Sequence, residues 1–95
     1  MAVSVVATFQ VNEGQQAEFA GYLREMIDIT KQEDGCIAYD LYGATDGSSE
    51  CVMVEIWESR ENLDLHLDSD HFKKFIPGTE AFLCAPASIK IYNRL

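Results

Sequence analysis

The fold is decided by one stretch of the chain, Glu50-Cys51-Val52-Met53-Val54-Glu55-Ile56-Trp57-Glu58. Successive side chains of a β-strand point to opposite faces of the sheet. Trp57 and Glu55 therefore share one face, whereas Val52, Val54 and Ile56 share the other. An antiparallel sheet usually keeps one polar face for water. Because both faces of this strand are largely apolar, the sheet that contains it needs cover on both sides.

The residues before this strand predict a strand, a helix and a second strand. Apolar residues alternate from Val3 to Val11, and Asn12 is a candidate helix cap with Gln15 as its capping-box partner. Asp34-Gly35 ends the helix. Helical spacing predicts its buried stripe: Phe19, Tyr22, Leu23, Met26, Ile27 and Thr30. The following strand, Cys36 to Tyr42, is predicted to place Ile37, Tyr39 and Leu41 on one face.

The residues after the central strand complete an α+β order. Ser59 is predicted to cap a second helix, and Ser69 a short third helix that ends before Pro77. Ile89-Lys90-Ile91-Tyr92 predicts a closing strand. The order β-α-β-β-α-β is that of the ferredoxin-like sandwich, with helices on one face of an antiparallel sheet. We expect one domain over residues 1–95, paired through its uncovered sheet face with a second copy as an isologous homodimer.

Composition narrows the range of partners. The formal net charge of −9 argues against nucleic acid or an anionic membrane as a partner, because phosphates would be repelled. The three cysteines form no C-x-x-C pair and are expected to be reduced packing thiols. The first residues are typical of a strand rather than a signal peptide, and no stretch approaches the roughly 20 apolar residues of a membrane span. We expect a cytoplasmic protein.

His66 and Trp57 are the candidate catalytic residues. His66 follows Leu63 by three positions, so both share the helix face that meets the sheet. His66 is either a general base or hydrogen-bond donor facing a pocket, or a core histidine whose hydrogen bonds are satisfied. Trp57 stands at the end of its strand, where it can form one wall of a site for a flat aromatic ligand. Tryptophan in such a position is also common in cores and interfaces.

Tyr39, Glu55, His71 and Phe75 are the candidate substrate-binding residues. Glu55 is a carboxylate on an apolar face, so it needs a partner, for which Arg24, His66 or a backbone amide is expected. A purely structural hydrogen bond would also explain Glu55, and an ordinary core would explain Phe75.

His71 lies among acidic residues and is expected to be exposed. A metal site is not expected, because two histidines five residues apart are poorly spaced for chelation on one helix and the helix breaks between them. No glycine-rich phosphate loop or nucleophile motif is present, so no cofactor is inferred from a motif.

Three groups of residues carry a family resemblance: Glu33-Asp34-Gly35-Cys36-x-x-Tyr39, Val54-Glu55-x-Trp57-Glu58-Ser59, and His66-Leu67-x-Ser69-x-His71-Phe72-x-x-Phe75. Together they resemble the antibiotic biosynthesis monooxygenase (ABM) domain family, especially its small bacterial quinol monooxygenases. The resemblance covers nearly the whole chain and implies a dimeric α+β barrel. It also implies oxidation of a small quinol or polyphenol by O2 without flavin, haem or metal. By position, Trp57 would line the pocket, His66 would handle the proton, and Tyr39 and His71 would bind substrate oxygens.

Other branches of the family define the alternatives. Haem-degrading members use an asparagine where this chain has Ala7 and a histidine near Pro77 that this chain lacks, so haem degradation is disfavoured. Members that process phosphorylated signalling sugars are disfavoured by the scarcity of basic residues. A non-catalytic barrel that binds small molecules, or one used in a stress response, stays an alternative because fold does not fix function.

Overall fold

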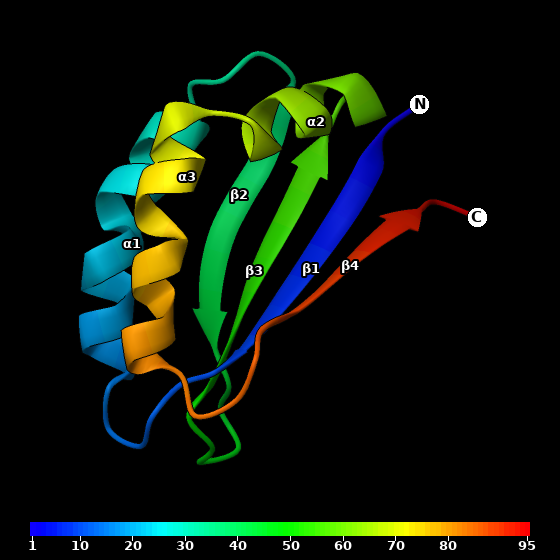
Figure 1. Cartoon of the computed structure of the whole chain (residues 1–95). Coiled ribbons are helices and arrows are strands. Elements are labelled where there is room, and N and C mark those ends of the chain that lie inside the picture. The colour runs from blue at the N-terminus through cyan, green and yellow to red at the C-terminus, as the bar shows by residue number, and fades with distance from the viewer.

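The computed structural model describes all 95 residues and follows the predicted order of elements (Figure 1). The strands are β1 (Val3–Gln10), β2 (Cys36–Gly43), β3 (Glu50–Trp57) and β4 (Ser88–Asn93). The helices are α1 (Gln16–Thr30), α2 (Arg60–Leu67) and α3 (Asp70–Phe75), followed by a 3₁₀ helix, η1 (Pro77–Phe82). None of the helices has the length and apolar character that crossing a bilayer demands.

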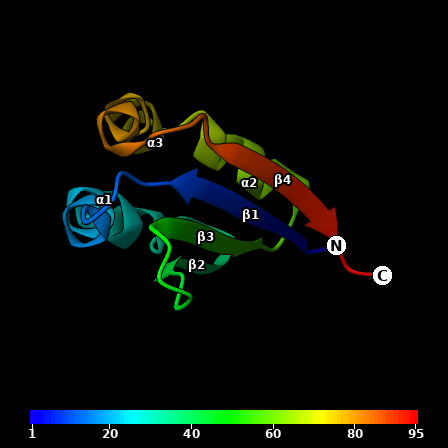
Figure 2. The same cartoon turned by 90° about the horizontal axis from the view of Figure 1, so that it is seen from below.

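The sheet has the ferredoxin-like topology that the sequence predicts. Its strands lie in the order β2-β3-β1-β4, as Figure 2 shows, and every neighbouring pair is antiparallel. The decisive strand β3 is therefore central, paired with β1 on one side and β2 on the other. The predicted α+β class is confirmed.

The core lies between the helices and one face of the sheet. The residues of β3 alternate between buried and half-buried, and those of β1 do the same, which confirms the two-faced pattern. The buried face of the sheet carries Trp57 and Met53, and it packs against Phe19 and Leu23 of α1 and Leu63 of α2. The opposite face of the sheet has no helix over it and keeps its apolar side chains only half-buried.

The first helix begins later than predicted. Asn12 is not its cap: α1 starts at Gln16, and the residue before it, Gln15, makes no side-chain capping bond. Residues 12–15 form a turn instead, closed by the Gln15 amide donating to the Asn12 carbonyl at 3.0 Å. Gly14 takes a positive φ of 78° in this turn, a conformation that glycine adopts without steric cost. The predicted capping box does not form, because its two residues, Asn12 and Gln15, belong to this turn.

The faces of β2 also differ from the prediction at one position. The register with β3 shifts between Cys36 and Ala38, so Ile37 is an extra residue in a β-bulge. Ile37 is consequently 57% exposed, whereas Tyr39 is buried. Simple alternation placed both residues on one face and was wrong for Ile37. The bulge brings Cys36 opposite Trp57 at the end of the sheet where α2 begins.

Candidate functional site

His66 is held inside a cage of aromatic rings. Ser59 caps α2 through its hydroxyl oxygen, which accepts from the Asn62 amide at 3.2 Å as predicted. The helix then directs His66 toward the sheet, where the side chain is fully buried. The centroid of its ring lies 4.8 Å from that of Trp57, 5.2 Å from that of Tyr39 and 5.0 Å from that of Phe72.

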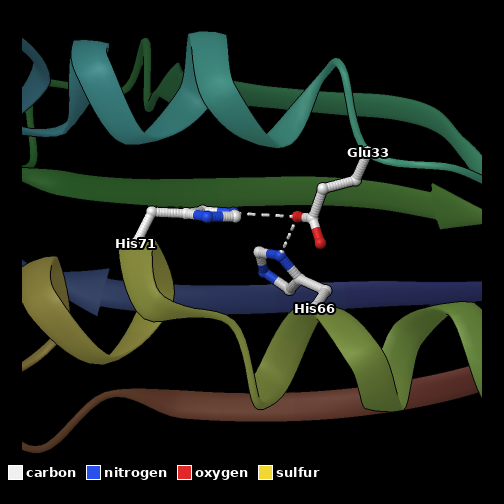
Figure 3. A group of neighbouring side chains, drawn as sticks. All are labelled: Glu33, His66 and His71. Atoms are coloured by element: carbon white, nitrogen blue, oxygen red, sulfur yellow. Dashed lines mark hydrogen bonds and ion pairs between the residues drawn. The ribbon is translucent and has the colours of Figure 1, made fainter.

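Glu33 joins the two histidines of the chain (Figure 3). Its Oε2 atom lies 2.6 Å from His66 Nδ1 and 2.9 Å from His71 Nε2. Glu33 comes from the turn between α1 and β2, and sequence reasoning missed it as a site residue. The only signal was its place beside Asp34-Gly35, where the sequence predicts the end of the first helix, although α1 already ends at Thr30. Nothing local indicates a contact with a histidine 33 residues away.

His71 is not exposed as predicted: its side chain is only 15% accessible. The reason is the break between α2 and α3 at Ser69. The Ser69 hydroxyl donates to the His66 carbonyl at 2.6 Å and accepts from the Phe72 amide at 3.3 Å, which ends one helix and starts the next. The change of direction brings both imidazoles to the same carboxylate. This break was expected to count against chelation, whereas the break is what brings the two rings together.

The environment of His66 favours a neutral ring. Burial lowers the pKa of His66, and the hydrogen bond and charge of Glu33 oppose that effect only in part. A neutral imidazole beside a carboxylate is expected to carry its proton on Nδ1 and donate it to Glu33. Nε2 then holds a lone pair, and it is buried without any hydrogen-bond partner.

Glu55 points to the helix side of the sheet and is 6% exposed. Its partner is none of the three that the sequence suggested: Glu55 Oε1 accepts a hydrogen bond of 3.0 Å from Trp57 Nε1, two residues along the same strand. Burial raises the pKa of Glu55 to about 7, although the bond from Trp57 opposes the rise. Glu55 is thus a carboxyl group whose proton is exchangeable near neutral pH.

Tyr39 and Glu55 lie opposite each other on β2 and β3 and both line a small apolar cavity of about 60 Å³. The Tyr39 hydroxyl makes no hydrogen bond within the protein. Burial raises the pKa of Tyr39, and the negative charges of Glu55 and Glu33 add to the rise, so the hydroxyl stays a donor. The other residues around the cavity are Ala7, Phe9, Leu23, Met26, Met53, Phe72, Ile76, Thr79, Ala87 and Ile89.

A larger hollow of about 630 Å³ adjoins this cavity. The two share Ile76, Thr79 and Ala87, so those residues lie where the small cavity meets the outer hollow. The outer hollow is also lined by Pro77, Glu80, Leu83, Ala85 and Pro86. Neither lining contains a lysine or an arginine.

Residues 2–78 match the family model described as antibiotic biosynthesis monooxygenase. The chain belongs to this family. The resemblance seen in the sequence is thereby confirmed. The fold described above is the fold of an ABM domain.

Several proteins are similar to this chain over most of its length. The chain is 34% identical over 89 residues to the "Putative monooxygenase Rv0793" of Mycobacterium tuberculosis, covering 94% of this chain and 87% of that protein. The solved structure of Rv0793 superposes with a TM-score of 0.90. A conserved protein from Methanosarcina mazei has 34% identity and a TM-score of 0.94, with 100% of this chain and 94% of that one covered. The uncharacterized protein sll1783 of Synechocystis is 29% identical over 96% of this chain, which spans 62% of that protein.

Within this ABM domain the structure separates the predicted site residues into groups. Tyr39 and Glu55 line the small cavity. His66 and Trp57 stand behind Tyr39, in ring contact with it but outside the cavity lining. Phe75 packs in the core against Tyr22, with ring centroids 5.6 Å apart, and also lies outside that lining.

Proposed function

We propose that this ABM protein is a cofactor-independent monooxygenase that oxidises a small quinol or polyphenol with O2. One observation carries the proposal: a cavity of apolar walls is lined, on adjacent strands, by an unpartnered tyrosine hydroxyl and a carboxyl group with a pKa of about 7. A phenolic substrate needs a proton acceptor, a donor for the resulting oxyanion and protection from water. The cavity offers all three.

Glu55 and Tyr39 take complementary roles in this proposal. Ionised Glu55 removes a proton from a substrate hydroxyl, because a base with a pKa near the working pH is effective. The Tyr39 hydroxyl donates to the oxyanion that forms. The anion passes one electron to O2, the two radicals combine at a ring carbon, and the peroxide loses water. Overall one quinol and one O2 give one hydroxyquinone and one water, so the electrons that reduce O2 come from the ring.

The substrate enters from the outer hollow. The small cavity of about 60 Å³ cannot hold an aromatic diol, whereas ligand sites commonly measure roughly 300–1,000 Å³. Movement of Ile76 and Thr79 would join it to the adjoining 630 Å³. The lack of basic residues in both linings favours an uncharged ring over a phosphorylated sugar.

His66 and Trp57 keep the catalytic importance that the sequence predicts, but through Tyr39. Both rings contact that of Tyr39 from outside the cavity lining, with centroids 5.2 and 6.3 Å away. Glu33 fixes His66 in turn. We therefore assign His66 and Trp57 as positioning residues for Tyr39, with Glu55 as the group that exchanges the proton.

We also propose that the protein works as a homodimer joined through the uncovered sheet face. Val6 and Val54 lie directly opposite each other on that face and are half-buried. Tyr42 and Tyr92 are 55% and 46% exposed at its two edges. A second copy would bury these side chains against the same residues of its own sheet.

The test is O2 consumption by chelator-treated protein with a panel of menadiol-like quinols. We expect turnover above the buffer rate, and a loss of about 100-fold in kcat for Glu55→Gln, the size typical of a missing general base. Tyr39→Phe is expected to lower kcat, and His66→Ala to abolish it through the displaced ring. Cys84→Ser, an exposed position outside both linings, is the matched control and should retain full activity.

The same experiment has three outcomes that contradict the proposal. Rates equal to buffer across the panel exclude the oxidation. Thermal stabilisation by quinones without turnover indicates a small-molecule receptor instead. Full activity of Glu55→Gln combined with an inactive His66→Ala returns the proton-handling role to His66, as the sequence predicts.

A further inference from the structure

Three metal-ligating side chains meet outside the cavity lining. Glu33, His66 and His71 come from the turn after α1, from α2 and from α3, respectively. One ligand atom from each lies within 4.8 Å of the other two. Figure 3 shows both imidazoles directed at the same carboxylate. We propose that these residues bind one divalent transition cation, for which Zn²⁺ is the representative probe.

The donor set decides the class of cation. Two imidazole nitrogens and one carboxylate oxygen form the His₂Glu set that holds zinc in open, water-bearing sites. Imidazole also suits copper, nickel and iron, whereas Mg²⁺ and Ca²⁺ prefer oxygen ligands alone. The cluster therefore selects a transition cation over the alkaline-earth cations, and it leaves coordination positions open to water.

Binding requires a small rearrangement, and the His66 proton moves from Nδ1 to Nε2 so that Nδ1 can coordinate the cation. With bonds of about 2.1 Å, the ligand atoms of a tetrahedral site lie roughly 3.4 Å apart. Glu33 Oε2 is now 2.6 and 2.9 Å from the two nitrogens, so the carboxylate must withdraw by under roughly an ångström while the two rings approach each other. Glu33 belongs to no helix or strand, and its side chain is 19% exposed, which gives it that freedom and gives the cation a way in.

The remaining features of the cluster favour a cation. No lysine or arginine forms a hydrogen bond or ion pair with any of the three residues. The net charge of −9 draws cations toward the protein. The rings around His66 and the hydrogen bonds of Ser69 hold the two imidazoles near their binding positions in advance. This proposal does not depend on the proposed oxidation.

Binding is tested on the full chain after treatment with a chelator. We expect calorimetry to show one equivalent of Zn²⁺ bound, and Mg²⁺ in excess not to compete. His71→Ala and Glu33→Gln should each weaken binding at least tenfold. Both side chains are partly accessible at the surface, and circular dichroism checks that the variants fold. Co²⁺ as a second probe should give visible absorption bands in the wild type that both variants lose.

Cys84→Ser is the matched control, because an exposed thiol is the other plausible zinc ligand on the surface. Its affinity for Zn²⁺ should equal that of the wild type. Three results would overturn the proposal: no retained Zn²⁺ in the wild type, unchanged affinity in folded His71→Ala and Glu33→Gln, or loss of binding in Cys84→Ser. None of these results bears on quinol turnover, which is measured without metal.

Discussion

At the scale of single residues, Glu55 is the least expected feature of the core. It is a nearly buried carboxyl group whose one hydrogen bond comes from the neighbouring indole on the same strand. A buried carboxylate with so little compensation is costly, so the protein holds the proton more tightly than the unfolded chain does. The same property that makes Glu55 a useful base makes it a source of instability at high pH.

The stability of the protein should therefore fall as the pH rises through the range that separates the two pKa values of Glu55. Between its ordinary value of 4.5 and its folded value of about 7, the folded state keeps a proton that the unfolded state has lost. The stabilisation that protonated Glu55 contributes is fully present below pH 4.5 and is lost above about pH 7. The difference between its two pKa values corresponds to about 3 kcal/mol in the free energy of unfolding.

Glu55→Gln should remove this dependence, because the amide is neutral at every pH and can still accept from Trp57. Urea denaturation of both proteins is measured at pH 4.5 and at pH 8. At pH 8 the free energy of unfolding of Glu55→Gln should exceed that of the wild type by about 3 kcal/mol. Glu58→Gln, an exposed change of the same charge, is the control and should follow the wild type. Parallel pH curves for the wild type and Glu55→Gln would mean that Glu55 is ionised in the folded protein.

At the scale of elements, the turns decide the site more than the helices and strands do. The turn of residues 31–35 carries Glu33, and the break at Ser69 directs His71. Gly35 is the tightest point of the first turn: it has a φ of 79°, and a Cβ there would collide with the side chain of Asn62 at the start of α2. The close approach of this turn to α2 places Glu33 beside His66.

Gly35→Ala should consequently destabilise the protein more than Gly47→Ala. Both glycines have positive φ, which costs a residue with a side chain about 1 kcal/mol. Gly47 has open space around it, so Gly47→Ala measures that backbone strain alone. Chemical denaturation measures the free energy of unfolding of each variant, and the difference between the two values is the cost of the collision with Asn62. Equal losses of stability in the two variants would show that the turn can move away from α2 without an energetic cost.

The element order was predictable because each signal is local. The alternation of β3, the caps at Ser59 and Ser69 and the stripe of α1 need only neighbouring residues to be recognised. The bulge at Ile37 was not predictable, since it depends on the pairing of β2 with β3.

The sequence predicted several residues of the candidate site, but it did not predict the contacts between them. Tyr39, Glu55, Trp57 and His66 do gather around one small region. Glu33 was missed because its partners are 33 and 38 residues away, and a single sequence carries no signal for such a pair. The exposure expected for His71 was wrong for the same reason: the acidic residues beside it in the chain form no hydrogen bond with its ring, whereas a distant acid does.

At the scale of the whole molecule, one face of the sheet is uncovered, and the second copy in the proposed dimer would cover it. Sedimentation at micromolar concentration should give twice the chain mass of 10.7 kDa. Val54→Lys places a charge at the centre of that face and should yield a folded monomer, with circular dichroism confirming the fold. Leu65→Lys, on an exposed position of α2, is the control and should stay dimeric. A wild-type mass near 10.7 kDa would rule out the dimer at that concentration.

The single tryptophan also gives the molecule a built-in optical reporter. Trp57 is fully buried, its indole nitrogen donates to Glu55, and its ring lies against His66. Its fluorescence therefore comes from one defined place, adjoining both the cavity carboxyl and the His66–Glu33–His71 cluster. Protonation of Glu55, entry of a quinol and capture of a cation would each change the surroundings of the indole. One fluorimeter cell can thus follow all three events in the unlabelled protein.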